Sequence, residues 1–281
     1  MTVKKDNTAE TLANKGYKPN VETVKKDAIA ATPAVKGSKP VAEKGIRIAK
    51  VMAHAGVCSR RDAEAMILEG RVQVNGVVIT TAATLITDQS IKVDGKLIQQ
   101  TNDVRIFIFH KPAGIITTAK DPHERKTIFD LLPKTMPRVI TIGRLDYNTE
   151  GLLLLTTNGD VARFIELPKT AWIRKYRARV FGTLNHERLK KLVNGITVDG
   201  VRYGSIKVEV DVEKDSNSWL TISITEGKNR EIRKVMEELG LKVNRLIRTN
   251  FGPFSLGDLK VGEVREIARN NLKNYLGEDF F

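Results

Sequence analysis

Gly143-Arg144-Leu145-Asp146-Tyr147-Asn148-Thr149-Glu150-Gly151 sets an arginine and a carboxylate two residues apart between two apolar runs. Val139–Ile142 predicts a short β-branched strand before this stretch, and Leu152–Thr157 predicts a buried strand after it. Because both runs need burial, the polar turn between them must emerge at the edge of a core, where rigid scaffolds present reactive groups. Taken alone, an aspartate in such a loop is more often a turn former or an ion-pair partner than a catalyst.

The composition bounds the class of protein. A chain of 281 residues with 41% hydrophobic content can bury a core and is long enough for two domains. The net charge of +14 and the pI of about 9.8 favour polyanionic partners such as nucleic acid. The single cysteine, Cys58, permits no internal disulfide and fits a reducing compartment. No metal-ligand spacing, membrane-spanning run or secretory signal is present, so we expect a cytoplasmic protein with no metal site.

Residues 1–44 differ in composition from the rest. They hold nine lysines and five acids but no Phe or Trp, so they cannot bury enough apolar surface to order the chain. We expect a disordered basic tail. Two roles stay open for it: non-specific contact with RNA phosphates, or a solubilising extension without a partner.

A small α+β module is expected over residues 45–100. Apolar residues at helical spacing end at Gly56, and Ser59 with Asp62 has the form of a capping box that starts a second helix. The dipeptides Asn75-Gly76 and Asp94-Gly95 each follow a short alternating run and predict hairpins.

This module resembles the RNA-binding domain first described in ribosomal small-subunit protein four. The likeness lies in Ala53-His54-Ala55-Gly56-Val57-Cys58-Ser59-Arg60-Arg61 and in Gly70-Arg71-Val72-Gln73-Val74-Asn75-Gly76. The resemblance implies that the helical pair binds structured RNA through its shape and its phosphates. Arg60, Arg61 and Arg71 gather around the second helix, where such a surface would need them.

Residues 103–270 alternate strands and helices without a nucleotide-binding fingerprint. Strands are expected at 104–109, 173–180, 206–212 and 219–225, with a loop at His110-Lys111-Pro112-Ala113-Gly114. No Gly-rich phosphate loop occurs, which argues against ATP, NAD or S-adenosylmethionine as a cofactor. The order of elements predicts an α+β domain with a mixed, mainly antiparallel sheet, followed by a C-terminal tail over 271–281.

A second constellation is the basic stretch Glu226-Gly227-Lys228-Asn229-Arg230-Glu231-Ile232-Arg233-Lys234. From Asn229 onward it predicts a helix whose apolar face holds Ile232, Val235, Met236 and Leu239. Arg230 and Arg233 lie off that face, and the helix N-terminus adds a favourable field for an anion. A solvated charged face is the usual meaning of this pattern. Arg245 and Arg248 extend the positive surface, which predicts a phosphate groove.

Taken in order, the motifs over residues 46–268 resemble the ribosomal-RNA pseudouridine synthases of the RsuA/RluB branch, with the RluB-like large-subunit enzymes most similar. The matching pieces are the RNA-binding module, Lys111-Pro112-Ala113-Gly114, Gly143-Arg144-Leu145-Asp146, Arg174-Lys175-Tyr176, the Gly227–Arg233 stretch, Leu246-Ile247-Arg248 and Phe251-Gly252-Pro253. The resemblance implies the isomerisation of uridine to pseudouridine, a reaction without net oxidation that needs no cofactor.

The resemblance also implies roles for individual residues. Asp146 would be the catalytic residue, either attacking the first carbon of the ribose or removing a proton from the second. Tyr176 would stack on the flipped uracil, and Arg233, or else Arg230, would pair with the carboxylate. Arg144 would fill the space that the base vacates. Contacts to RNA are expected from Arg60, Arg61, Arg71, Arg144, Lys175, Lys228, Arg230 and Arg248.

The expected partner is ribosomal RNA of the large subunit or its precursor particle, and a monomer is expected. Two other functions stay open at the level of sequence. One is a non-catalytic RNA-binding or ribosome-assembly protein, and the other is a synthase acting on small-subunit ribosomal RNA.

Overall fold

The computed structural model describes residues 45–99, 103–119, 121–167 and 170–281. The tail expected over residues 1–44 lies outside the described residues. The described residues form an N-terminal module over 45–99 and a larger domain that follows it in the chain.

The module consists of two short helices and short antiparallel strands around its own core. Its helices are α1 (Ile48–His54) and α2 (Arg60–Leu68), and its strands are β1 (Ile46–Arg47), β2 (Val72–Val74), β3 (Val77–Ile79), β4 (Leu85–Ile86), β5 (Ile91–Val93) and β6 (Lys96–Leu97). The sheet order is β3-β2-β5-β6, and β1 pairs with β4. Ser59 caps α2 by accepting a hydrogen bond from the Asp62 amide at 3.1 Å, as the sequence indicated.

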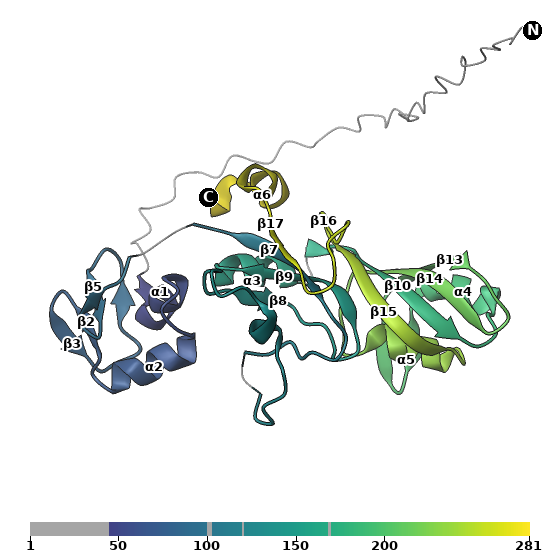
Figure 1. The fold of residues 1–281 in the computed structure, drawn as a ribbon, viewed down its shortest axis with the longest axis horizontal. Helices are drawn as coiled ribbons and strands as arrows, with labels where there is room; N and C mark the ends of the chain where they lie inside the picture. Colours follow the sequence, from purple (N-terminus) through teal and green to yellow (C-terminus); the bar gives the residue numbers. More distant parts are fainter. Residues whose placement is uncertain (1–44, 100–102, 120, 168–169) are drawn as a thin grey trace, which may run out of the picture. The chain divides into compact units, whose positions relative to one another are not determined.

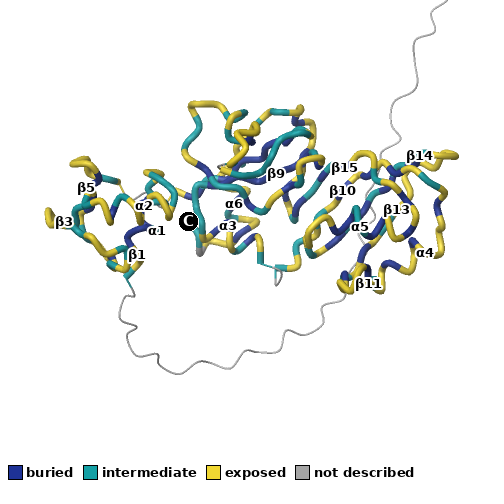
Figure 2. The backbone as a smooth tube through the Cα atoms, turned by 90° about the horizontal axis from the view of Figure 1, so that it is seen from below, coloured by how far each residue is buried: buried dark blue, intermediate teal, exposed yellow. Residues whose placement is uncertain are grey.

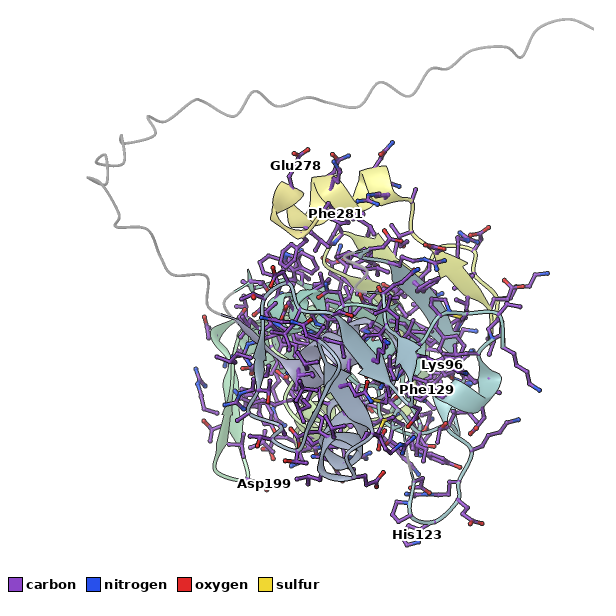
Figure 3. The ribbon with its side chains drawn as sticks, turned by 90° about the vertical axis from the view of Figure 1, so that its left-hand side faces the viewer. Lys96, His123, Phe129, Asp199, Glu278 and Phe281 are labelled. Carbon is purple, nitrogen blue, oxygen red and sulfur yellow. The ribbon has the colours of Figure 1, made fainter. Side chains whose placement is uncertain are left out.

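Both hairpin predictions in this module are confirmed. Asn75 and Gly76 have φ values of 49° and 84°, and Asp94 and Gly95 have 48° and 77°. Two consecutive left-handed residues give the turn whose twist matches that of paired strands. A third turn of this kind, at Asp199, was not foreseen, and it forms the exposed tip of a hairpin (Figure 3).

In the described part of the larger domain, nine strands form one sheet (Figure 1). They are β7 (Ile106–Lys111), β8 (Ile140–Ile142), β9 (Glu150–Thr156), β10 (Arg174–Phe181), β13 (Ile206–Val212), β14 (Asn217–Ile224), β15 (Lys242–Phe251), β16 (Phe254–Ser255) and β17 (Val264–Glu266). The main path is β13-β14-β10-β15-β9-β7-β17, with β8 on β9 and β16 on β15. Only the β9–β15 pair is parallel among these strands, so the expected mixed, mainly antiparallel α+β fold is confirmed.

The sheet separates two cores, because β9 is buried on both faces (Figure 2): Leu153 and Leu155 belong to one core and Leu152 and Leu154 to the other. One core packs the apolar face of α5 (Glu231–Glu238) against the sheet, and the other packs α3 (Gly159–Glu166) and α6 (Arg269–Leu276) against it. The remaining elements are α4 (His186–Lys191), the hairpin β11 (Ile196–Val198) with β12 (Val201–Tyr203), and the short helices η1 (Ile128–Leu131), η3 (Leu192–Asn194) and η4 (Glu278–Phe280).

The C-terminal segment differs from our expectation of a tail over 271–281. Leu272 and Leu276 of α6 are 1% and 7% exposed and belong to the second core. Phe280 packs on Phe164 with ring centroids 5.1 Å apart. The segment is therefore part of the packed domain, because its apolar residues recur at helical spacing and cover the sheet.

Candidate functional site

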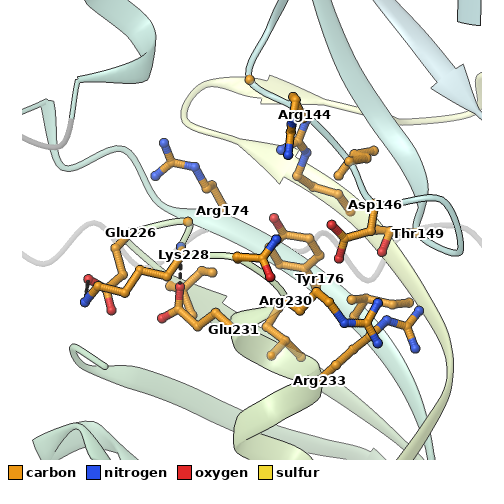
Figure 4. A pocket seen from close by; sticks show the side chains of 18 of the residues that line it. Arg144, Asp146, Thr149, Arg174, Tyr176, Glu226, Lys228, Arg230, Glu231 and Arg233 are labelled. Atoms are coloured by element: carbon orange, nitrogen blue, oxygen red, sulfur yellow. Dashed lines mark hydrogen bonds and ion pairs between the residues drawn. The ribbon is translucent and has the colours of Figure 1, made fainter. Parts of the chain in front are cut away.

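A cavity of about 540 Å³ is lined by the loop after β8, by the first turn of α5 and by the central strands β10 and β15. Figure 4 shows Asp146, Tyr176 and Arg233 directed into this cavity from the loop, from β10 and from α5. Its other lining residues include Arg144, Thr149, Arg174, Lys228, Arg230, Glu231 and Arg248. The structure thus brings together residues that lie more than 80 positions apart in the sequence, as the bond joining Arg233 to Asn148 illustrates.

The loop that carries Asp146 is fixed by its neighbours. Leu145 is 5% exposed and packs into the first core, so the two residues beside it are turned outward. The carbonyl of Asp146 accepts a hydrogen bond from the Thr149 amide at 3.0 Å, which closes the turn. The amide of Gly143 donates to Glu166 at 2.6 Å. The half-buried Asp146 carboxylate and the exposed Arg144 are therefore displayed by a well-anchored loop.

Lys111 lies beneath this loop and is fully buried. Its ammonium donates to the carbonyls of Pro112, Asp146, Tyr147 and Thr149 at 3.0, 3.2, 3.4 and 3.0 Å. Burial lowers the pKa of Lys111 to about 8, although the charge of Asp146 opposes the shift. From the sequence, Lys111 was only one residue of a loop that resembles the family, and no role was predicted for it. A Lys-Pro pair just after an apolar strand was the available signal.

Arg233 approaches the same loop from the other side. Its guanidinium donates to the carbonyl of Asn148 at 2.9 Å and to that of Val243 at 2.8 Å. Burial lowers the pKa of Arg233 and nearby Arg230 lowers it further, while the charge of Asp146 acts in the opposite direction. Arg233 is thus within electrostatic reach of Asp146. Arg230 is exposed at the N-cap of α5, with a left-handed φ of 51°, and lines the cavity mouth.

Tyr176 and Lys175 fall on opposite faces of β10. Tyr176 is 8% exposed and lines the cavity, whereas Lys175 is exposed. Successive side chains of a strand point to opposite faces, so one strand cannot direct both into the same cavity. The structure therefore does not bring Lys175 into this site, and a contact of Lys175 with RNA stays a prediction for another surface.

The parallel pairing of β9 with β15 sets the position of the loop relative to the rest of the site. Gly151 pairs with Arg248 and has a φ of 101°. A Cβ at this position would collide with the carbonyl oxygen of Arg248, so only glycine allows the two strands to approach this closely. Beside it, Glu150 accepts two hydrogen bonds from Arg245, both at 2.9 Å.

Arg248 is not the surface arginine that we expected. Its side chain is 3% exposed, its Nε donates to the carbonyl of Leu152 at 2.7 Å, and it lies over the ring of Phe251. Arg174 also lies over this ring and donates to the carbonyl of Thr225 at 2.6 Å. Burial lowers the pKa of Arg174. Both arginines belong to the wall of the cavity rather than to an exposed groove.

The loop before α5 is held by an acidic pair. Lys228 donates to Glu226 and to the carbonyl of Arg202, both at 2.7 Å, so its ammonium is already engaged. The carboxylate of Glu231 accepts from the Lys228 amide at 3.0 Å. Burial raises the pKa of Glu231 to about 7, and the neighbouring charge of Glu226 reinforces the shift. A proton on Glu231 lets the two carboxyl groups share this small volume.

The arginines that the sequence assigned to RNA binding in the N-terminal module do not line this cavity. Arg60 and Arg61 are exposed on α2. Arg71 donates to both oxygens of Asp94, at 2.8 and 2.7 Å, and to Glu69 at 3.1 Å. This ion pair bridges the end of α2 and the second hairpin, so Arg71 already has carboxylate partners.

Neither a membrane-spanning helix nor a metal site is found among the described residues. No described helix is both long and apolar enough to span a bilayer. Within the same residues, no three His, Cys, Asp or Glu side chains gather into a potential metal site.

The cavity is lined by several basic side chains and holds the Asp146 carboxylate, a charge pattern that suits a polyanionic substrate such as nucleic acid. Residues 105–238 match the family model described as RNA pseudouridylate synthase, and residues 46–88 match that of the S4 domain. The chain belongs to the RNA pseudouridine synthase family and is an isomerase.

Individual relatives agree with this membership. An uncharacterized RNA pseudouridine synthase of Rickettsia felis is 47% identical over 228 residues, which cover 81% of this chain and 99% of the relative. The ribosomal large subunit pseudouridine synthase B of Pasteurella multocida is 38% identical and covers 84% of this chain and 70% of the relative. A crystal structure of a pseudouridylate synthase, 24% identical, superimposes with a TM-score of 0.59 over 82% of this chain and all of the other. The last comparison supports the fold alone.

Proposed function

We propose that this protein converts a specific uridine of large-subunit ribosomal RNA into pseudouridine, by base flipping and an aspartate-dependent mechanism without a cofactor. The observation that carries the proposal is the Asp146 carboxylate, displayed in a cavity lined by Tyr176 on a loop that Lys111 and Arg233 hold. Relatives in Pasteurella multocida and Yersinia pestis that are named large subunit pseudouridine synthase B support the choice of RNA.

The reaction balances without an external reagent. The bond between ribose C1′ and uracil N1 breaks, the base rotates, and C1′ joins C5 of the same base. The proton on C5 leaves and N1 gains one, so nothing is oxidised and no atom is added. The protein must therefore supply only orientation, charge and proton transfer.

Asp146 is the group that acts on the ribose in this proposal. An ionised carboxylate can attack C1′ or remove the proton from C2′, and both routes begin from the same charged form. Arg233 keeps the carboxylate charged among RNA phosphates, because an opposite charge stabilises the ionised form. Arg230 is the second choice for this role, one helical turn away.

The base must leave its stack before it can react, which costs a few kcal/mol in a paired strand. Tyr176 offers an aromatic face inside the cavity on which the flipped uracil can stack. Arg144, exposed at the cavity rim, is placed to occupy the space that the base leaves in the RNA.

The test uses ribosomal RNA from a strain that lacks this gene. Large- and small-subunit RNA are incubated separately with the wild-type protein, with Asp146→Asn and with Asp258→Asn, and pseudouridines are then mapped. Asp258 is the matched control, because it is an exposed aspartate that pairs with Arg265 outside the cavity. We expect one new site in large-subunit RNA with the wild type and the control, and none with Asp146→Asn.

Other results point elsewhere. Turnover by pure Asp146→Asn refutes the catalytic role of the carboxylate. A new site in small-subunit RNA only replaces the proposed substrate. Tight binding without any product, in naked RNA and in precursor particles alike, favours a ribosome-assembly protein that keeps the synthase fold.

A further inference from the structure

One row of paired residues runs across the sheet and includes two residues that line the cavity, Tyr176 and Arg248. Gly151 of β9 pairs with Arg248 of β15, Arg248 pairs with Tyr176 of β10, and Tyr176 pairs with Ile222 of β14. Directly opposed residues on neighbouring strands have Cβ atoms about 5 Å apart. Arg248 is therefore the immediate neighbour of the aromatic ring, on the side that faces the Asp146 loop.

The guanidinium of Arg248 is buried but incompletely bonded. The side chain is 3% exposed, and within the described residues its only hydrogen-bond acceptor is the carbonyl of Leu152, reached by Nε. Nη2 is buried and has no acceptor, and Arg248 forms no ion pair with a described carboxylate. Buried polar groups are almost always bonded, and a buried charge without an acceptor is unfavourable. Since Arg248 lines the cavity, the missing acceptor can come from a bound molecule.

The position of Arg248 suits a base better than a phosphate. Arg144 and Arg230 are exposed at the cavity and are accessible to the sugar-phosphate backbone. Arg248 instead lies beneath them in the wall, beside Tyr176, where only a group inserted into the cavity can reach it. A pyrimidine stacked on that ring presents its carbonyl-bearing edge to a neighbouring side chain, and arginine is a donor with no acceptor capacity.

We propose that Arg248 donates a hydrogen bond to a carbonyl oxygen of the flipped uracil and so selects and orients the base. The inference rests on the proposed function, because it takes the flipped uridine as the molecule that fills the cavity. If the contact is made at C4, it would also discriminate against cytosine. Cytosine carries an amino group at C4, and this donor cannot accept a hydrogen bond from the guanidinium of Arg248.

The experiment combines a side-chain change with a single-atom change in the RNA. A fragment containing the mapped uridine is made with uridine, 2-thiouridine or 4-thiouridine at the target, and kcat/KM is measured for the wild type, for Arg248→Met and for Arg265→Met. Sulfur accepts hydrogen bonds weakly, so each thio-substituted RNA weakens one carbonyl contact. Arg265 is the matched control, because it is an arginine of the same sheet that is exposed, bonded to Asp258 and outside the cavity lining.

We expect Arg248→Met to lower kcat/KM on uridine RNA by about 10²-fold, as the loss of a charged hydrogen bond does. In the wild type and in Arg265→Met, one of the two thio substitutions should lower kcat/KM by a factor about ten times larger than the factor by which it lowers kcat/KM in Arg248→Met. This comparison cancels the intrinsic reactivity of the thio base. The position that shows the effect identifies the carbonyl that Arg248 contacts.

Equal thio effects in all three proteins overturn the inference, and Arg248 is then a structural residue that supports Leu152. Arg248→Lys, which retains the charge and the stem, carries the same comparison if Arg248→Met loses its native circular dichroism. A wild-type protein without activity on uridine RNA overturns the proposed function itself. A fully active wild type without coupling overturns only the role of Arg248.

Discussion

Replacing Lys111 with methionine removes the ammonium beneath the Asp146 loop while it retains the length of the side chain. The change leaves loop carbonyls, including those of Asp146 and Thr149, without their buried donor. An unsatisfied buried group costs about 1–3 kcal/mol, so we expect the free energy of unfolding at pH 7 to fall by on the order of 3 kcal/mol. A small displacement of the loop should also reduce turnover by about 10²-fold.

The pH dependence of this difference is a sharper test. Lys111 has a pKa of about 8 in the folded protein against an ordinary value of 10.5, because burial disfavours the charged amine. Below pH 8 the amine is protonated in both states, so the folded protein carries the full cost of a buried charge. Between pH 8 and 10.5 the unfolded chain binds more protons than the folded one, and the wild type gains stability. Over this range the wild type should gain about 3 kcal/mol relative to the methionine variant.

Urea unfolding followed by the fluorescence of Trp172 and Trp219 at pH 7, 8, 9 and 10 measures this difference. Groups that titrate in both proteins cancel in the comparison. Lys190→Met, at an exposed lysine on α4, controls for the loss of a surface charge. Its unfolding free energy should differ from that of the wild type by a small amount that does not change with pH. If the difference in unfolding free energy between the wild type and Lys111→Met stays constant or becomes smaller above pH 8, burial does not lower the pKa of Lys111.

Three further outcomes are expected. Tyr176→Ala should lower kcat/KM by about 10–10²-fold, because the stacking surface for the base is lost. Tyr176→Phe should bind RNA normally. Equal activity of Tyr176→Phe and the wild type in single-turnover assays would show that the hydroxyl has no role. Gly151→Ala should destabilise the fold by several kcal/mol, because the added Cβ collides with the adjacent strand. Gly76→Ala, whose Cβ would have no heavy atom near it, should cost about 1 kcal/mol. Similar losses of stability for the two variants in thermal unfolding would contradict the close approach of the strands at Gly151. Glu231 has a pKa of about 7 in the folded protein, so the wild type loses stability as the pH rises from 4.5 to 7, whereas Glu231→Gln does not. The Tm of Glu231→Gln should therefore rise relative to that of the wild type between pH 5 and 8. A constant difference between the two Tm values would count against the shared proton.

Local chemistry in the sequence was sufficient for several of the strands, for the hairpins at Asn75 and Asp94 and for the class of fold, but not for the hairpin at Asp199. Asn75 and Gly76 determine their turn through their own backbone preferences, and the alternating runs determine which strands are buried. The face of Lys175 could also have been predicted, because a strand that buries Tyr176 must turn its neighbour away.

The buried cations could not be found in this way. Lys111 and Arg248 occupy positions that composition alone would place at the surface, since lysine and arginine are seldom buried. Their burial depends on acceptors distant in sequence: Lys111 bonds to carbonyls up to 38 residues away, and Arg248 bonds to one 96 residues away. Only the assembled sheet brings these acceptors together.

The position of β15 has a consequence for synthesis of the chain. This strand lies between β9 and β10, so before it is made the sheet exists only as two separate pieces, each with an open edge. Domains form as their residues leave the ribosome, and open strand edges are prone to aggregation. The edges that β15 covers therefore stay without this partner strand until the chain has been made as far as Phe251.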